Sequence, residues 1–200
     1  IIAMPAAIGI SVMAHPIYNA VYGAGDGGAL LRVFGPASFF CCMQLYTTAM
    51  LQASGLERAP MITFPLGGAL MLVIDYILVG NREIGILGSP YGTLACFAFI
   101  TLMNFIILAV KSPARPRLIK TAGKPLVIAG IMGVAAFAVH GLLSRLLAGN
   151  GRGIVTLRLL GTVAVAAMVY LVLIVYTKTI TKEDLALVPR GDKLAKLLRL

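Results

Sequence analysis

Asp75, in the stretch "MLVIDYILVG", is the residue in this sequence best suited to ion chemistry. The chain has seven carboxylates, and Asp75 is the one that lies inside a long apolar run. In a helix that crosses a membrane, an ionisable group costs several kcal/mol and marks a functional site by default. Two interpretations stay open: Asp75 binds a cation or a proton, or it is an interfacial acid bonded to a neighbouring helix or to water.

A polar stripe marks another apolar run and consists of Gln44, Thr47, Thr48 and Gln52. At 100° per residue, these four side chains cover about 140° of a helix surface. The stripe predicts either one wall of a substrate cavity, with Gln44, Thr48 and Gln52 facing water, or a seam of hydrogen bonds to a partner helix. Asn104 is an amide in the middle of a different run, and we expect it to form an interhelical hydrogen bond.

Arginines gather around the last turn between apolar runs, at Arg145, Arg152 and Arg158. Guanidinium groups bind phosphate oxygens in a bidentate manner, so these residues could contact a phosphate or a pyrophosphate. Alternatively, they are anchors whose aliphatic stems lie in the membrane while their charged ends reach water. Both interpretations stay open.

Signatures of catalysis and of metal binding are missing from the sequence. It contains no G-x-S-x-G, no H-E-x-x-H and no Walker loop. The three cysteines lie in apolar runs without C-x-x-C spacing, which suits small apolar packing residues better than metal ligands. We therefore expect no enzyme activity, no metal site and no organic cofactor. The chemistry that remains is moving or holding a ligand.

Composition places the chain in a membrane. Of its 200 residues, 60% are hydrophobic and 12% are charged, whereas soluble domains are about a quarter charged. A soluble fold of this length could not bury so much apolar surface. The net charge of +10 is explained by basic loops beside anionic lipid, so no nucleic-acid partner is expected.

Six apolar runs have about the length of a membrane-crossing helix, which is about 20 residues. Backbone groups in lipid must be satisfied within their own segment, so each run should be a helix. The sequence therefore predicts an all-α polytopic membrane helix bundle over residues 1–176, followed by a basic tail over 177–200. The expected helices cover residues 3–22, 29–54, 60–80, 86–110, 125–148 and 155–176.

Charge predicts the orientation of these helices. If successive segments alternate between the two sides of the membrane, twelve of the 17 Lys and Arg residues lie on the side of the tail and five on the other. Lys and Arg accumulate in cytoplasmic loops. We therefore expect the basic loop 111–124 and the tail 177–200 to be cytoplasmic. The tail either lies on the inner leaflet or is solvated.

The order of several short stretches carries a resemblance to a known family. They are "MAHPIYNAVYG", "LLRVFGPASFF", "LQASGLERAPM", "IDYILVGNREIGILGSPYGT" and "ITKEDLALVPRGDKLAKLL". The chain resembles the C-terminal part of the polysaccharide-biosynthesis and lipid-flippase proteins of the multidrug/oligosaccharidyl-lipid/polysaccharide exporter superfamily. Within it, the stretches are most similar to the stage V sporulation protein B group. Because the sequence opens inside an apolar run, we expect it to be part of a longer chain.

The resemblance implies a fold and a function. The chain would form the last six helices of a fourteen-helix flippase, paired with an N-terminal lobe in the bacterial inner membrane. Alternating access would export an undecaprenyl-linked saccharide or a peptidoglycan precursor. The last two helices would form a groove for the lipid tail. Na⁺ or H⁺ would be the coupling ion, and Na⁺ would be held between helices 60–80 and 86–110 by Asp75 and Thr93. His15 and Pro90 depart from the group's pattern.

Other functions stay open beside the flippase. One alternative is a cation-coupled multidrug antiporter of the same superfamily. Another is a membrane enzyme or a scaffold of cell-wall or spore-coat assembly.

Overall fold

The computed structural model describes residues 3–23, 27–111, 118–146 and 152–176, and every regular element in these ranges is helical. Five helical segments are long and apolar enough to cross a membrane. The prediction of an all-α polytopic membrane bundle is therefore confirmed. The predicted tail, 177–200, lies outside the described residues, as do residues 112–117 of the basic loop 111–124 and residues 147–151 before α7.

The first expected helix, 3–22, is wrong as a single element. It consists of two short helices, α1 (Ala3–Val12) and α2 (Ala14–Tyr22), with Met13 between them. Pro16 explains the break, because it has no N–H to donate to the carbonyl of Val12 and its ring clashes with that turn. The Met13 amide still donates to the Gly9 carbonyl, and the Ile17 amide donates to the Met13 carbonyl. The break therefore bends the chain without unwinding it.

The other elements follow the expected runs closely. They are α3 (Gly28–Ala53), α4 (Arg58–Val79), the 3-10 turn η1 (Gly85–Gly88), α5 (Ser89–Lys111), α6 (Leu118–Leu146) and α7 (Arg152–Tyr176). The start of α6 lies well before the expected residue 125, because apolar length reveals only the part of a helix that lies in lipid.

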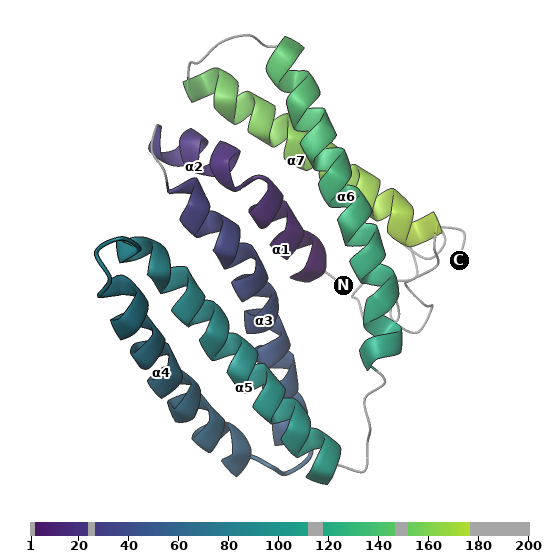
Figure 1. Cartoon of the computed structure of the whole chain (residues 1–200). Helices are drawn as coiled ribbons and strands as arrows, with labels where there is room; N and C mark the ends of the chain where they lie inside the picture. Colours follow the sequence, from purple (N-terminus) through teal and green to yellow (C-terminus); the bar gives the residue numbers. More distant parts are fainter. Residues whose placement is uncertain (1–2, 24–26, 112–117, 147–151, 177–200) are drawn as a thin grey trace.

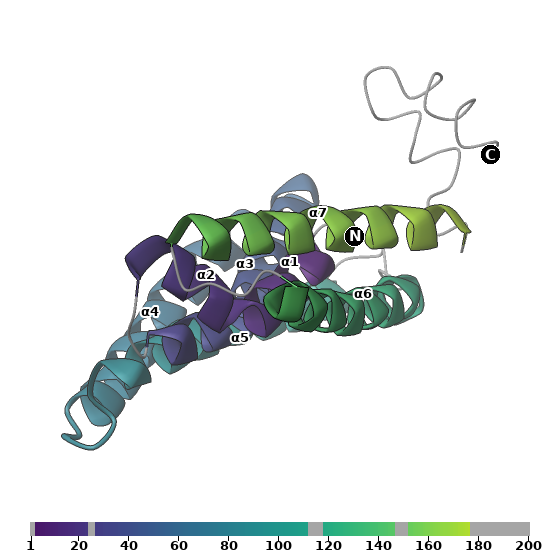
Figure 2. The ribbon, with the colours of Figure 1, turned by 90° about the horizontal axis from the view of Figure 1, so that it is seen from above.

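The helices pack in a continuous series. Helix α4 packs on α5, α5 packs on α3, and α3 packs on α1. Helix α1 also contacts α6, which forms a hairpin with α7. Helix α2 contacts both α3 and α7. Figure 1 shows successive long helices running in opposite directions, with α4 and α5 on the far side of α3 from the α6–α7 hairpin. Figure 2 shows the same hairpin beside α1 and α2 from above.

Two interiors of different chemistry hold this series together. Between α1, α6 and α7 the core is apolar and includes Met4, Met132 and Tyr170. Between α3, α4 and α5 it contains buried polar residues, with Asn104 fully buried. Large apolar side chains point outward instead, such as Tyr76, which is 85% exposed. Buried polar side chains and exposed apolar side chains are expected of a protein whose solvent is lipid.

Candidate functional site

Asp75 lies where α4 packs on α5. The carboxylate is seated over Gly92, and a Cβ atom at Gly92 would collide with Asp75 Oδ1. This oxygen is buried and has no hydrogen-bond partner in the part of the chain that the structure describes. Burying a carboxylate oxygen without a partner is unfavourable, so the site suits a ligand that neutralises it, such as a cation or a proton.

Thr93 follows Gly92 directly on α5, one residue after the glycine that meets Asp75. The Thr93 hydroxyl donates to the Ser89 carbonyl oxygen at 3.3 Å. Since its one proton is used in this bond, the hydroxyl oxygen can offer a lone pair to a cation. Carboxylate and hydroxyl oxygens suit a hard cation. The assignment of an ion to these residues stays a prediction.

The polar stripe of α3 faces α5 through hydrogen bonds. The Asn104 side-chain amide donates to Thr48 Oγ1 at 3.1 Å and to Thr47 Oγ1 at 3.4 Å. The Gln44 amide donates to Thr48 Oγ1 at 3.5 Å, and Gln44 is 2% exposed. Thr48 therefore takes part in a hydrogen bond to a partner helix, whereas Gln44 bonds within α3. The assignment of Gln44 and Thr48 to a substrate cavity stays a prediction. The expected interhelical role of Asn104 is confirmed.

Gln52 lies apart from this seam. It is exposed near the C-terminal end of α3. Its assignment to a substrate cavity stays a prediction.

Two partners in the buried polar interior were not predicted. Thr63 of α4 donates to Asn104 Oδ1 at 2.9 Å, and Thr101 of α5 donates to the Phe40 carbonyl at 3.2 Å. A threonine in the middle of a helix often bonds within its own helix, so the sequence alone does not predict the interhelical bonds of these two residues. Asn104 thereby joins three helices, since its partners come from α3 and α4.

The three arginines occupy different surroundings. Arg145 is exposed in the last turn of α6, and Arg152 begins α7, where its side chain lies outside the description. Arg158 is half-buried on α7. Phosphate binding by these arginines stays a prediction.

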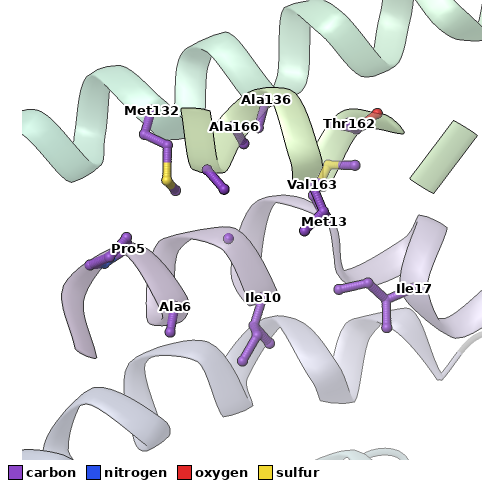
Figure 3. Close-up of a pocket in the computed structure, with 12 residues that line it drawn as sticks. Pro5, Ala6, Ile10, Met13, Ile17, Met132, Ala136, Thr162, Val163 and Ala166 are labelled. Atoms are coloured by element: carbon purple, nitrogen blue, oxygen red, sulfur yellow. The ribbon is translucent and has the colours of Figure 1, made fainter. Parts of the chain in front are cut away.

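An apolar groove runs between the first helices and the last hairpin. Its cavity volume is about 230 Å³. Figure 3 shows side chains from both sides of this space, with Met132 and Ala136 of α6 opposite Ala6 and Ile10 of α1. Residues of α1 and α2 therefore line one side of the cavity and residues of α6 and α7 line the other. That it serves as the expected groove for a lipid tail stays a prediction. The full lining is Pro5, Ala6, Gly9, Ile10, Met13, Ile17, Met132, Ala136, Thr162, Val163, Ala166 and Ala167.

Small residues keep the groove open. Gly9, Ala136 and Ala166 carry little or no side chain where larger residues would fill the space. The Thr162 hydroxyl donates to the Arg158 carbonyl at 2.8 Å, so its proton is not available to a ligand. The groove thus suits a hydrocarbon chain and offers few hydrogen-bond partners to a saccharide.

Similarity to known proteins extends over nearly the whole chain. The uncharacterized membrane protein YabM of Bacillus subtilis (strain 168) is 28% identical over 197 residues, which are 97% of this chain and 36% of that protein. Stage V sporulation protein B of the same organism is 23% identical over 178 residues, which are 89% of this chain and 33% of that protein. No family model and no solved structure matches the chain.

These similarities agree with the resemblance to the stage V sporulation protein B group. The chain spans about a third of the length of both curated relatives. Together with the five helical segments of membrane-crossing length, they describe a membrane-embedded protein related to part of two longer bacterial proteins.

Proposed function

We propose that this chain forms the C-terminal lobe of a membrane flippase, which exports a lipid-linked oligosaccharide or a peptidoglycan precursor by alternating access. The lobe works with an N-terminal lobe in the bacterial inner membrane, and its C-terminus is cytoplasmic. The substrate is an undecaprenyl-linked saccharide. The protein is a transporter and not an enzyme, and it needs no cofactor beyond a coupling ion.

The apolar groove between α1, α2, α6 and α7 is the observation that carries this proposal. A lipid-linked saccharide has a long hydrocarbon tail that must stay in an apolar environment while its polar end crosses the membrane. The groove has an apolar lining and a volume of about 230 Å³, and two of the helices that form it, α6 and α7, contain segments of membrane-crossing length. The similarity to stage V sporulation protein B supports the same class of protein.

Asp75 supports ion coupling. Its buried oxygen without a hydrogen-bond partner in the described residues suits Na⁺ or H⁺, with Thr93 as a further donor of an oxygen ligand. Release of the ion would leave a carboxylate in an apolar contact, which is costly, so ion binding and the α4–α5 packing should depend on one another. This coupling also fits the alternative function, a cation-coupled multidrug antiporter.

A reconstitution experiment tests the proposal. The intact protein is inserted into liposomes that contain a fluorescent undecaprenyl-pyrophosphate saccharide, and a membrane-impermeant quencher reports the fraction in the outer leaflet. We expect the protein to accelerate exchange between leaflets. Ala167→Phe should slow this exchange at least tenfold, because the new ring fills the groove that Ala167 lines.

Ala164→Phe is the matched control. Ala164 is exposed on the same helix and is not part of the groove lining, so this variant should transport normally. Cation-driven drug uptake without lipid exchange would favour the antiporter instead. If neither lipid exchange nor drug uptake occurs and the lipid-linked saccharide is chemically changed, a membrane enzyme is favoured. If no activity of any kind is detected, a scaffold is favoured.

A further inference from the structure

A second cavity, of different character, lies at the junction of α4 and α5. It is formed where the turn after α3 meets the last turn of α5, and its volume is about 420 Å³. We call it the interfacial pocket. Its lining consists of Gly55, Leu56, Glu57, Arg58, Ala59, Ile62, Thr63, Ile107 and Lys111. None of these residues takes part in the groove or in the Asp75 site.

Its position in the membrane follows from the helices that form it. Of the two membrane-length segments that meet here, one begins at Arg58 and the other ends at Lys111. The pocket therefore lies at the boundary between the apolar part of the bilayer and the headgroup region. Next to it, Met61 and Val110 are 74% and 78% exposed. In a membrane, apolar side chains this exposed contact acyl chains.

Two cations from distant parts of the sequence meet in the pocket. Arg58 opens α4 and Lys111 closes α5, and both are exposed. Glu57 supplies one negative charge, so the lining carries a net charge of +1. Within the described residues, neither cation forms an ion pair with Glu57 or with another acid. Among the described residues, therefore, no acid neutralises either cation, and each can face an external anion.

The remaining walls are suited to the apolar part of a ligand. Ile62 is 62% exposed, Ile107 is half-buried, and both line the pocket on its membrane side. At its floor, Thr63 uses its hydroxyl proton in the bond to Asn104. The pocket therefore presents two cations toward the headgroup region and aliphatic side chains toward the bilayer core.

We propose that the interfacial pocket binds the phosphate group of an anionic phospholipid, with Arg58 and Lys111 at the headgroup and Ile62 and Ile107 against the first part of an acyl chain. Basic pockets between membrane helices are a recurring site for anionic headgroups. The chemistry of the cations alone would also accept free phosphate, but the adjacent apolar wall favours a lipid. This site is independent of the substrate that the protein transports.

Lipid titration of the intact protein in a neutral detergent tests the proposal. Short-chain phosphatidylglycerol, short-chain phosphatidylcholine and inorganic phosphate are added separately, and the rise in melting temperature gives an apparent Kd for each. We expect saturable binding of phosphatidylglycerol alone. Arg58→Gln and Lys111→Gln should each weaken it by about fivefold, the effect of one cation near an anionic lipid. Glu57→Gln should tighten it, because the like charge is removed.

Arg82→Gln is the matched control, since Arg82 is an exposed arginine in the turn after α4 and does not line the pocket. It should bind phosphatidylglycerol as the unmodified protein does. An equal loss in Arg82→Gln, or unchanged binding in Glu57→Gln, would overturn the site. If inorganic phosphate binds as tightly as phosphatidylglycerol, the proposal of a lipid ligand is wrong and the pocket binds a soluble phosphate.

Discussion

The contact between Asp75 and Gly92 depends on the type of both residues. The absence of a side chain at Gly92 makes the room that the Asp75 carboxylate occupies. Without that room, the carboxylate would have to leave the α4–α5 interface, where one of its oxygens is buried without a hydrogen-bond partner among the described residues. A buried acid in such a place costs free energy unless a ligand or a proton offsets the charge.

Asp75→Asn should abolish the response of the protein to its coupling cation. Na⁺ that binds only the folded protein should stabilise it by about 2.7 kcal/mol at 100 times its Kd. The variant keeps the shape of the side chain and loses its charge, so its melting temperature should not change with Na⁺. Glu83→Gln, which changes an exposed carboxylate in the turn after α4, should respond like the unmodified protein. An undiminished Na⁺ response in Asp75→Asn would place the ion elsewhere.

Asn104→Leu should destabilise the bundle. The variant removes the acceptor of Thr63 and the donor to Thr47 and Thr48. Interhelical hydrogen bonds in membranes are worth about 0.6 kcal/mol on average and up to about 1.7 kcal/mol. We therefore expect a loss of about 1 to 2 kcal/mol in unfolding by denaturing detergent. Ser54→Ala, which removes an exposed hydrogen bond at the end of α3, should cost less than about 0.5 kcal/mol. Equal stability of both variants would argue against the network.

At the scale of elements, two prolines shape the first half of the chain in different ways. Pro16 separates α1 from α2, whereas Pro36 lies inside α3 without ending it. Pro36 leaves the Arg32 carbonyl without its usual donor four residues later. The Ser11 hydroxyl of α1 donates to this carbonyl at 3.2 Å. Gly35 lets α1 approach this closely, because a Cβ atom there would collide with Ser11.

A double-mutant cycle measures whether the Ser11 hydroxyl replaces the backbone amide that Pro36 lacks as the donor to the Arg32 carbonyl. Ser11→Ala should cost about 1 kcal/mol in the presence of Pro36, because the Arg32 carbonyl then loses its donor. In a Pro36→Ala background, the residue 36 amide can donate to Arg32 within the helix, and Ser11→Ala should cost much less. The free energies of unfolding of the four proteins give the coupling. Strictly additive effects would show that the bond to Ser11 does not compensate for the proline.

At the scale of the whole molecule, alternating helices and a strongly biased charge should set the orientation. The described helices run in alternating directions, with the C-terminal ends of α3 and α5 at one end of the molecule and the C-terminal end of α6 at the other (Figure 1). The end that holds Arg58 and Lys111 also leads into the basic loop 111–124. Cytoplasmic retention of this end would place the interfacial pocket in the inner leaflet.

Reporter fusions should give opposite results at two positions. Green fluorescent protein fused after residue 200 should fluoresce, and alkaline phosphatase at the same place should be inactive, since we expect the tail in the cytoplasm. Phosphatase inserted after residue 150, in the turn between α6 and α7, should be active on the opposite side. The reverse pattern would mean that the twelve-to-five bias of Lys and Arg does not determine the orientation.

Local properties of the sequence determined the helices themselves. In lipid, a backbone must satisfy its hydrogen bonds within its own segment, so apolar length alone predicts where a helix lies. This reasoning located α3, α4, α5 and α7 to within a few residues, and it missed the early start of α6. The break in the first run could have been predicted as well, because Pro16 removes a specific backbone bond. The bonding role of Asn104 followed from its type and its place in the middle of a helix.

Tertiary structure alone decided which faces meet. Asn104 is 41 residues from Thr63 and 56 from Thr48, and nothing local relates them. The seat of Asp75 over Gly92, the groove shared by α1 and α7, and the meeting of Arg58 with Lys111 depend in the same way on how helices approach one another. That approach depends on the fit of small and large side chains across an interface, and such a fit exists only once both surfaces are in place.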